Sequence, residues 1–585
     1  MSTDKAFSDY TQHALLVAWG TFAAHIGLLQ QFQELALKQK VYKHTPQAKV
    51  LEFLVAILAG LPHLQDISRA SHPLDKDRAV AEAWGQERWA DYSAVSRTLK
   101  GLSWEEVNQI VQALETVSRP FLEAEVAQIR QKGERICMDG DLAGLSVSDG
   151  SSTFPNAAYG HMDAEIRLGY QAAVISMRSS TFGRLWLSVT HHPGDIVACS
   201  LAEALVLAAE ERLGVRPQRR TDLVRQRIEA LEQAMATTAR RLEAQEKAVE
   251  EAQRQVAAAK EQLQTRQQHL AELEQHYQAK GLPERPHSRL ARARKGVEVA
   301  EKRLRRWEQK LSLAQRRLEK TRQRLTRQQE ELAALHRRLE RFEQDNATNP
   351  DPVQAEFRLD AGFGTYENLM LLIEMGYEVY TKPYSHRVVD HLVRQTDEQT
   401  EWEQMGEHVE IVAWKGKKLK GFPYPVDVAL KRSHTNKGIR HSVFLHFGSD
   451  PVTEDVPGWI AHYNGRQSIE AGIKESKQVF HLHRLKVRSE PAIFLQEAFV
   501  IFAANFIRWA LHWLTHLPQP DEQALDVRRL GIKRLVQVGA HVSAHISLSS
   551  EGKLLRFTEW SAFAGKVLRL PLSTAPPSQQ KTRKN

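Results

Sequence analysis

The sequence predicts an α/β protein whose sheet-forming segments are separated by a long helical insertion. Short runs rich in β-branched and aromatic residues occur between residues 134 and 192 and again between residues 356 and 383. Two stretches with an apolar residue at every seventh position lie between these runs. Helical periodicity dominates residues 1–132 and returns around residues 463–514. Together these patterns predict a helical N-terminal region, an α/β core and a coiled-coil insertion.

Composition narrows the classes of function. The chain has 585 residues, which suggests about three or four structural units, and 42% of them are hydrophobic, enough for sizeable cores. The formal net charge of +9 favours a polyanionic partner. Two cysteines, Cys137 and Cys199, cannot build a disulfide framework, and both lie in apolar runs. We therefore expect reduced core cysteines in a cytoplasmic protein.

The apolar segments do not predict a membrane protein. The sequence begins with no basic-then-apolar signal peptide. The most apolar window, residues 492–514, contains charged and amide side chains such as Glu497 and Arg508, which favours a buried helix. The sequence also contains no GxxxxGK[ST] motif, so the long coil does not indicate a P-loop ATPase.

Residues 1–132 are expected to be helical. Residues 91–106 predict a short helix, a break at Gly101 and a second helix that starts at Ser103, with Glu106 completing a capping box. A plain helical bundle and a DNA-binding region both fit this pattern. The first helix would carry a polar face able to meet phosphates, formed by Ser93, Ser96, Arg97 and Lys100.

The segment of residues 134–147 contains a short apolar run that ends at two aspartates. Asp139 and Asp141 flank a glycine, and further β-rich runs follow at residues 166–177 and 184–192. Because strand side chains alternate between faces, both aspartates would point to the same side of a sheet. A simple Asp-Gly turn is the alternative interpretation.

Two heptad arms between residues 219 and 346 predict an antiparallel coiled-coil hairpin. The segment KGLPERPHS between them contains a glycine and two prolines that interrupt any helix. Residues 289–345 carry 18 Lys and Arg against 9 Asp and Glu, while residues 221–278 carry 8 against 10. The arms could therefore attract each other, or the basic arm could track DNA or hold a partner. The heptad positions are Ile228, Met235, Leu242, Val249, Val256, Leu263, Leu270 and Tyr277, then Leu290, Val297, Leu304, Leu311, Leu318, Leu325, Leu332 and Leu339.

A third acidic position follows the insertion. The segment EFRLDAGFGTYENLMLLIEMGYEVYTKP places Asp360 at the end of a short strand, before a glycine-assisted turn, an amphipathic helix and a second strand. The runs HVEIVAWKG, PVDVALKR and SVFLHF then alternate in β fashion. They predict a β-rich insertion over residues 385–458.

Four side chains of the stretch YNGRQSIEAGIKESK would share one helix face. Tyr463, Arg466, Glu470 and Lys477 stand at offsets of 0, 3, 7 and 14, within an arc of roughly 60° on an α-helix. A carboxylate beside two cations and a phenol suits a site that holds a divalent metal next to a phosphate. A solvent-exposed helix with incidental charges is the alternative. Two glycines within the stretch leave the exact start of the helix open.

The pattern Y-x2-R-x3-E-x6-K resembles the signature helix of the DDE-class transposases of bacterial insertion sequences, the YREK group. The R-x-D-x-G-F arrangement around Asp360 resembles the second-acid motif of the same group. The resemblance covers about residues 50–218 and 347–515, and the coiled coil departs from the usual pattern. It implies a ribonuclease H-like core, with Asp141 as the rival for the first acid. The implied residues are Asp139, Asp360 and Glu470 as catalytic metal ligands, and Tyr463, Arg466 and Lys477 as DNA-binding residues.

The resemblance also implies cofactors and partners. Two Mg²⁺ ions, which Mn²⁺ could replace, would serve cleavage at the ends of an element and strand transfer into target DNA. The DNA partners would be the terminal inverted repeats and the target, and the protein would act as a homodimer in the bacterial cytoplasm, near the nucleoid. An aromatic residue of the β-rich insertion, Trp414 or Trp459, could stack on a flipped base, or both could be core residues.

Two other function classes stay open at this point: a ribonuclease H-like nuclease that cuts without joining, and a nucleic-acid-binding coiled-coil scaffold with an inactive core. The expected organisation is a helical, DNA-binding region at 1–132, core segments at 133–218, 347–384 and 459–520, a coiled coil at 219–346, a β-rich insertion at 385–458 and a C-terminal region with a basic tail at 521–585.

Overall fold

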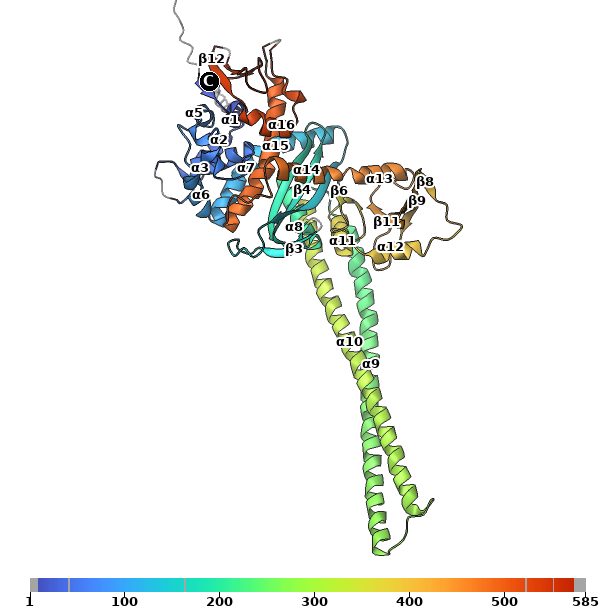
Figure 1. Ribbon diagram of the computed structural model, residues 1–585. Helices are drawn as coiled ribbons and strands as arrows, with labels where there is room; N and C mark the ends of the chain where they lie inside the picture. The colour runs from blue at the N-terminus through green and yellow to red at the C-terminus, as the bar shows by residue number, and fades with distance from the viewer. Residues whose placement is uncertain (1–8, 40–42, 163–164, 521–522, 551, 573–585) are drawn as a thin grey trace, which may run out of the picture. The chain divides into compact units, whose positions relative to one another are not determined.

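The computed structural model describes residues 9–39, 43–162, 165–520, 523–550 and 552–572 (Figure 1). It divides into two compact units. The first unit comprises residues 1–218 and 351–585, and the second comprises residues 219–350. The first is a mixed α/β unit with a large sheet, and the second is a pair of long helices, so the predicted combination of an α/β fold with a long helix pair is confirmed.

Helices fill the N-terminal part of the first unit, as predicted. The capping box at the start of α7 is present: the Ser103 side chain accepts from the backbone N–H of Glu106, and Glu106 Oε2 accepts from the backbone N–H of Ser103 at 2.9 Å. Gly101 separates α6 from this helix. The helices are α1 (Ala14–His25), α2 (Leu28–Gln33), α3 (Pro46–Leu58), α4 (Asp66–Arg69), α5 (Arg78–Ala83), α6 (Tyr92–Lys100) and α7 (Trp104–Gln131).

Three antiparallel strands open the main sheet. They are β2 (Ile136–Ser146), β4 (Glu165–Ser179) and β5 (Gly183–Pro193), and β3 (Ala158–Met162) pairs with the first part of β4. After the insertion, β6 (Ala355–Leu359) pairs in parallel with β2, and β7 (Glu378–Thr381) pairs in parallel with β6. The neighbouring order is therefore β5-β4-β2-β6-β7, so strands from both sides of the insertion form one sheet.

The β-rich segment predicted after residue 385 extends this sheet. Strand β11 pairs antiparallel with β7, and β10, β9 and β8 follow in order. A buried cluster that includes Tyr380, Phe444, Trp459 and Tyr463 joins these strands to the helix that follows them. The elements are α12 (His386–Val393), β8 (Glu403–Gly406), β9 (Val409–Lys417), β10 (Val426–Thr435) and β11 (Gly438–Phe447).

Helices pack against the sheet and close the unit. Helix α14 contacts β2, and α15 contacts β5 and the N-terminal helices (Figure 1). By length and composition alone α15 could cross a membrane, but 83% of its most apolar window is buried. That burial agrees with the predicted core helix. The helices are α8 (Ala202–Leu213), α11 (Tyr366–Glu374), α13 (Val456–Asn464), α14 (Gln467–Val479), α15 (Glu490–His516) and α16 (Ile532–Gln537).

A small antiparallel sheet ties the two ends of the first unit together. The order β1-β12-β13-β14 brings a strand that the sequence did not predict, β1 (Asp9–Thr11), beside β12 (Ala544–Ser549). The remaining strands are β13 (Gly552–Phe557) and β14 (Val567–Leu570). Residues 573–585 of the predicted basic tail lie outside the described residues.

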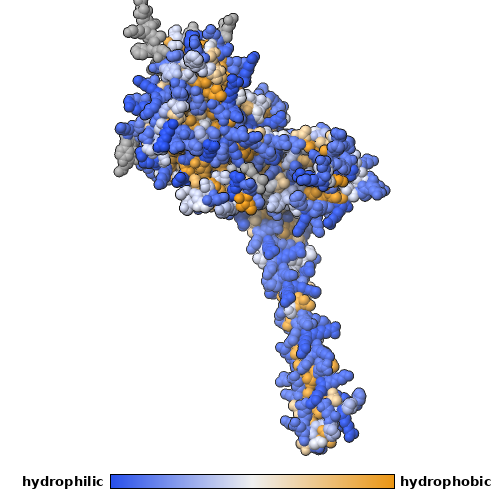
Figure 2. All heavy atoms as spheres, viewed as in Figure 1, coloured by the Kyte–Doolittle hydropathy of each residue, from blue (hydrophilic) through white to orange (hydrophobic). Residues whose placement is uncertain are grey.

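The second unit is the predicted antiparallel helix pair, α9 (Thr221–Ala279) and α10 (Arg289–Ala347). Ion pairs join the arms in reverse order: Arg225 with Glu343, Arg322 with Glu246, and Arg294 with Glu274. Apolar heptad residues such as Val256 and Leu318 are buried between the arms, while the outer surface of this hairpin is largely hydrophilic (Figure 2).

Candidate active site

The pairing of β2 with β6 brings the predicted acids together. In this parallel pair Asp139 stands opposite Arg358, and the next position pairs Gly140 with Leu359. The same register continued by one residue places Asp141 beside Asp360, which directly follows β6. Because side chains two residues apart share a face, both strands direct polar side chains toward α13 and α14.

Asp139 is held in a buried ion pair. Its two carboxylate oxygens accept hydrogen bonds from Nε and Nη2 of Arg358, both at 2.8 Å, and each residue is 2% exposed. Arg358 Nη1 donates to the backbone oxygen of His462 at 2.9 Å. Burial raises the pKa of Asp139, although the Arg358 guanidinium opposes this shift. Both oxygens of Asp139 thus already have a donor within the protein.

A second acidic group gathers around Arg466. Nη1 of Arg466 lies 3.4 Å from Asp141 Oδ2, and Nη2 donates to Glu470 Oε1 at 2.5 Å. Asp360 is close enough for its charge to raise the pKa of both Arg466 and Asp141. Three carboxylates from β2, from the turn after β6 and from α14 therefore surround one guanidinium, although they are far apart in the sequence.

The electrostatics of Asp141 reflect this crowding. Its pKa is raised to about 6, chiefly by burial and to a smaller extent by the nearby charges of Asp360 and Glu470, against the opposing charge of Arg466. The backbone N–H of Leu142 donates to Asp141 Oδ1 at 2.8 Å. The site therefore contains more negative charge than a single guanidinium neutralises.

The predicted signature helix is not continuous. Tyr463 lies near the end of α13, Arg466 caps the start of α14, and Glu470 and Lys477 belong to α14. The break falls at Gly465, where a Cβ atom would lie only 2.4 Å from Arg358 Nη1. The expectation of one uninterrupted helix was wrong: Arg358 Nη1 donates to the backbone oxygen of His462, and the Arg466 N–H donates to the Tyr463 oxygen instead of to that of His462.

Gly472, the other glycine in this stretch, also lies against an arginine side chain from the sheet. A Cβ atom on Gly472 would lie 2.2 Å from Cζ of Arg184, whose guanidinium donates to the backbone oxygen of Ser468. The two glycines that weaken the helix prediction thus allow two arginines from the sheet to approach the helix backbone.

Tyr463 is buried and borders the acidic group. Its ring contacts Phe444 edge-on with 5.3 Å between ring centroids, and the Lys382 ammonium lies 5.3 Å from its ring centroid. Burial raises the pKa of Tyr463 to about 12, so its phenol keeps its proton at neutral pH. Lys477, the fourth predicted member, is half-buried in the last turn of α14.

Lys382 is a candidate residue of this site that the sequence prediction missed. It directly follows β7, the parallel neighbour of β6, and therefore reaches the same sheet edge as Asp360. Burial lowers its pKa, and the neighbouring charge of Arg466 lowers it further. Its position at the end of the second predicted strand was a signal that could have identified it.

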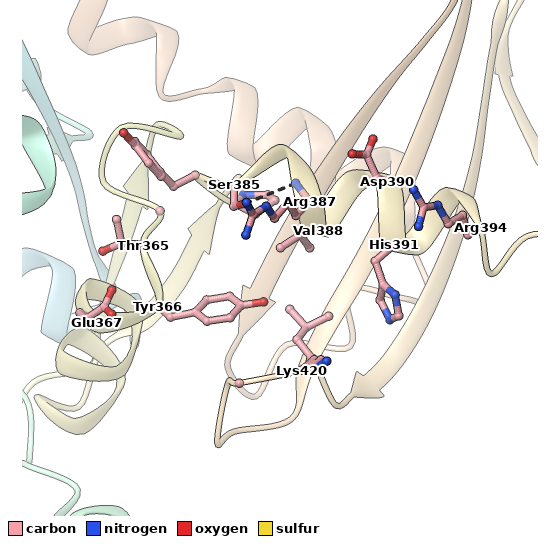
Figure 3. Close-up of a pocket in the computed structure, with 15 residues that line it drawn as sticks. Thr365, Tyr366, Glu367, Ser385, Arg387, Val388, Asp390, His391, Arg394 and Lys420 are labelled. Carbon is pink, nitrogen blue, oxygen red and sulfur yellow. Dashed lines mark hydrogen bonds between the residues drawn. The ribbon is translucent and has the colours of Figure 1, made fainter. Parts of the chain in front are cut away.

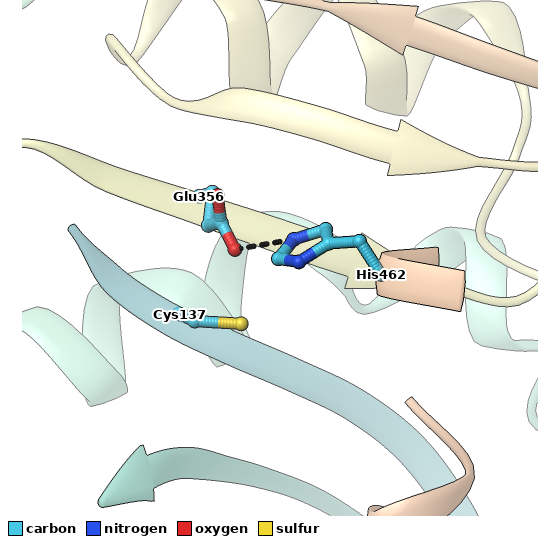
Figure 4. A group of neighbouring side chains, drawn as sticks. All are labelled: Cys137, Glu356 and His462. Carbon is cyan, nitrogen blue, oxygen red and sulfur yellow. Dashed lines mark ion pairs between the residues drawn. The ribbon is translucent and has the colours of Figure 1, made fainter. Parts of the chain in front are cut away.

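One further set of side chains could hold a metal ion. The ligand atoms of Cys137, Glu356 and His462 lie within 4.8 Å of one another (Figure 4). Glu356 Oε1 is 2.7 Å from His462 Nε2, and burial raises the pKa of the Cys137 thiol. This group is thus a protonated thiol beside a close His462–Glu356 contact, and the predicted core position of Cys137 is confirmed. The side chain of Cys199 lies outside the described residues.

The ligand atoms of a comparable set, Glu378, His446 and Asp450, also lie within 4.8 Å of one another. Arg135 pairs with Glu378 at 3.2 Å and with Asp450 at 2.6 Å. The negative charge of this set is therefore offset by an arginine of the protein itself. Among the described residues, Asp141, Asp360 and Glu470 do not form a set this compact, and Arg466 lies between Asp141 and Glu470.

A cavity of about 810 Å³ opens beside the turn that follows Asp360 (Figure 3). Arg387, His391 and Arg394 from one face of α12 line it together with Tyr366. Two arginines beside an aromatic ring suit a nucleic-acid strand. Lys420 and the acidic side chains of Glu367 and Asp390 also line it.

The two tryptophans considered for base stacking have different environments. Trp459 is 3% exposed within the cluster formed with Phe444 and Tyr463. Trp414 is half-buried, with the Lys417 ammonium 4.1 Å from its ring centroid. Trp459 is therefore a core residue in this structure.

Comparison with known proteins adds little to this geometry. No family model matches the sequence, and no curated protein matches it. The chain has a distant structural similarity to a solved piggyBac transposase synaptic complex with hairpin DNA. The TM-score is 0.37 and the identity 8%, over 90% of this chain and 80% of that chain. A similarity at this level does not establish a common fold.

Proposed function

We propose that the chain is a DNA transposase of the DDE class, in which Asp141, Asp360 and Glu470 hold divalent metal ions for phosphoryl transfer. The observation that carries the proposal is the gathering of these three carboxylates around Arg466. Their order along the chain and the Y-x2-R-x3-E-x6-K pattern support the YREK group among such enzymes.

The sheet supports a ribonuclease H-like core. Its three opening strands are antiparallel, and the first of them, β2, carries the first acid. The second acid follows β6, the parallel neighbour of β2. This agrees with the expectation that three opening strands, the first with a metal ligand, precede the second-acid motif.

We place the first metal ligand at Asp141 and not at Asp139, which the motif alone favours. Arg358 occupies both oxygens of Asp139, and releasing them would leave a buried guanidinium without its partner. Asp141 has one oxygen within reach of Arg466 and belongs to the same charge cluster as Asp360 and Glu470.

The donor set fits Mg²⁺, with Mn²⁺ as a substitute, because all three side chains offer carboxylate oxygens. The pKa of Asp141 is raised chiefly by burial, with smaller contributions from the charges of Asp360 and Glu470, and divalent cations bound there would favour its ionised form. When bound, two such ions supply activation of the attacking oxygen and stabilisation of the leaving oxygen.

The residues around the carboxylates would position the DNA. Arg466 is permanently charged and can exchange Glu470 for a phosphate oxygen, which frees the carboxylate. Tyr463 keeps its proton and can donate a hydrogen bond. Lys382, which lies close enough to Arg466 for the two charges to interact, and Lys477 in the last turn of α14 would add positive charge. The cavity lined by α12 offers a path for the strand beyond the cleaved bond.

A cleavage and joining assay tests the proposal. The substrate is a DNA duplex that carries the inverted repeats flanking the coding sequence, with Mg²⁺ and a target plasmid. We expect the wild type to cut at the repeat ends and join them to the target, and Asp360→Asn and Glu470→Gln to bind without cutting. Nicks without joined product would instead favour the nuclease, and binding without any cutting by the wild type would favour the inactive scaffold.

The proposal also includes the cellular setting. A transposase has to bring two DNA ends together, so we propose a homodimer that acts on DNA in the bacterial cytoplasm. Light scattering would test the homodimer. It would measure the mass of the protein–DNA complex at one and at two DNA ends for each pair of protomers.

A further inference from the structure

A cavity separate from the acidic site lies between the N-terminal helices and the segment that follows α14. It has a volume of about 570 Å³. Tyr92, Ser96 and Lys100 of α6 line one part of it, and Lys486 and Arg488 line another. Two of these, Ser96 and Lys100, belong to the polar face predicted from the sequence. The lining therefore combines hydroxyl groups with cations.

Lys486 has an unusual environment within this lining. Its ammonium nitrogen is buried and has no hydrogen-bond partner among the described residues. Its backbone N–H donates to Gln496 Oε1 at 2.8 Å, and Gln496 Nε2 donates to the backbone oxygen of Arg484 at 3.0 Å, so the Lys486 backbone is held in place. An ammonium group without a partner in a buried position is costly unless an anion joins it.

The surroundings are rich in positive charge. The charge of Arg484 adds to burial in lowering the pKa of Lys486 to about 7, and Asp66 opposes this shift. Asp66 already accepts a hydrogen bond from the backbone N–H of His63 at 2.8 Å. The pKa of His481 falls to about 4 through burial and the charges of Lys486 and Arg484. The effect of the Asp66 carboxylate is thus smaller than the combined effects of burial and Arg484 on Lys486.

We propose that this cavity binds a phosphate group of duplex DNA, with Lys486 as the central contact and Lys100 and Arg488 as flanking cations. The inference rests on the proposed function, since it assumes that DNA is the partner. The anion is a phosphate because hydroxyl donors from Ser96 and Tyr92 accompany the ammonium groups, a set that matches several phosphate oxygens at once. Bound there, DNA would contact the N-terminal helices as well as the core.

Binding of a labelled duplex, followed by fluorescence anisotropy in EDTA over a range of salt concentrations, tests this inference without any cleavage. Lys486→Met should weaken binding about 10- to 100-fold, because it removes one charge-assisted contact. The slope of log affinity against log salt should fall by about one unit, and equally for unrelated sequences. Lys486→Arg should retain most of the affinity.

The matched control is Lys132→Met, which removes the same charge from an exposed residue at the end of α7. It should leave the salt slope unchanged. The double variant Lys100→Met with Arg488→Met changes exposed side chains only and should also weaken DNA binding and lower the salt slope. It replaces Lys486→Met in the test if that variant fails to fold. Wild-type affinity and slope in folded Lys486→Met would overturn the inference.

Inorganic phosphate separates the possible sources of the anion. Tens of millimolar phosphate should raise the melting temperature of the wild type but not of Lys486→Met, and should compete with the duplex. If phosphate stabilises only the wild type while both proteins bind DNA equally, the site serves a free phosphate compound and the DNA assignment is wrong. If the wild type binds no duplex, the proposed function itself fails.

Discussion

At the scale of single residues, the two aspartates of β2 have opposite roles. Asp139 neutralises a buried arginine, whereas Asp141 adds negative charge to an acidic group that Arg466 only partly balances. The first arrangement leaves a buried charge unpaired if either partner is removed, whereas the second leaves carboxylates for which we propose divalent cations. Such a division of roles is testable because each aspartate has an isosteric asparagine variant.

Asp139→Asn should destabilise the protein strongly, by about 3–5 kcal/mol, because it leaves the Arg358 guanidinium buried without a counter-charge. Asp141→Asn should leave stability unchanged or slightly raised, because it removes repulsion, and should abolish cleavage. Denaturant unfolding and the cleavage assay measure the two effects. A stable, inactive Asp139→Asn would reverse the assignment.

Arg466 and Glu470, at the start of α14, allow a second comparison. Arg466→Ala should weaken binding of DNA ends about 10- to 150-fold, since a charge-assisted phosphate contact contributes roughly 1.5–3 kcal/mol. Glu470→Gln should bind DNA but stop cleavage, because the amide is a poor metal ligand. Gel-shift and cleavage assays with the same duplex would check both. Equal loss of binding in the two variants would indicate a structural helix.

Lys486 allows a prediction of how the stability of the folded protein depends on pH. Its pKa in the folded protein is about 7, below its ordinary value of 10.5, so the unfolded chain binds more protons between these two values. Stability from this group therefore rises with pH from about 7 toward 10.5, and the full cost of the buried charge is present below about 7. Lys486→Met should raise the melting temperature most at pH 6. A difference from wild type that does not change with pH would contradict this reasoning.

The sequence can propose single residues for a site where a motif fixes their spacing. The motif identifies Asp360, Glu470 and Arg466 by their spacing, and the structure brings them near one another. It favoured Asp139 and kept Asp141 as the rival, because strand alternation puts both on one face. The choice depends on which of them stands opposite Arg358, and that register is set by chain segments on either side of a long insertion.

At the scale of elements, the heptad arms are the most predictable part of the chain. Their pattern is local, so it determines both the helices and their antiparallel pairing. The bounds of α9 and α10 agree with the predicted insertion to within a few residues. The break between α13 and α14 could not be predicted, because it follows from a non-local contact between Gly465 and Arg358.

Deletion of residues 222–344, with the two ends joined, should leave a folded and soluble α/β unit. The arms bury their apolar residues against each other and form a separate compact unit. Circular dichroism and thermal unfolding of the shortened chain, beside the full-length protein, would measure this. Insolubility of the shortened chain alone would show that the core depends on the helix pair.

At the scale of the whole molecule, the main sheet explains how distant segments form one site. Strands before and after the insertion pair as parallel neighbours, so Asp141 and Asp360 meet although 218 residues separate them in the 585-residue chain. Local patterns predicted the strands, but not that the β-rich segment would extend the same sheet through β11. Strand pairing of this kind is a property of the whole chain and leaves no local signal in the sequence.

The central claim is that Asp141, Asp360 and Glu470 form a divalent metal site, and anomalous diffraction from crystals soaked with Mn²⁺ tests it most directly. We predict anomalous peaks within roughly 2.2 Å of carboxylate oxygens of Asp141 and Asp360, with Arg466 displaced from Glu470 and the Asp139–Arg358 pair intact. Crystals of Asp360→Asn should show no peak there. Mn²⁺ bound at Cys137, Glu356 and His462 with this acidic site empty would contradict the account.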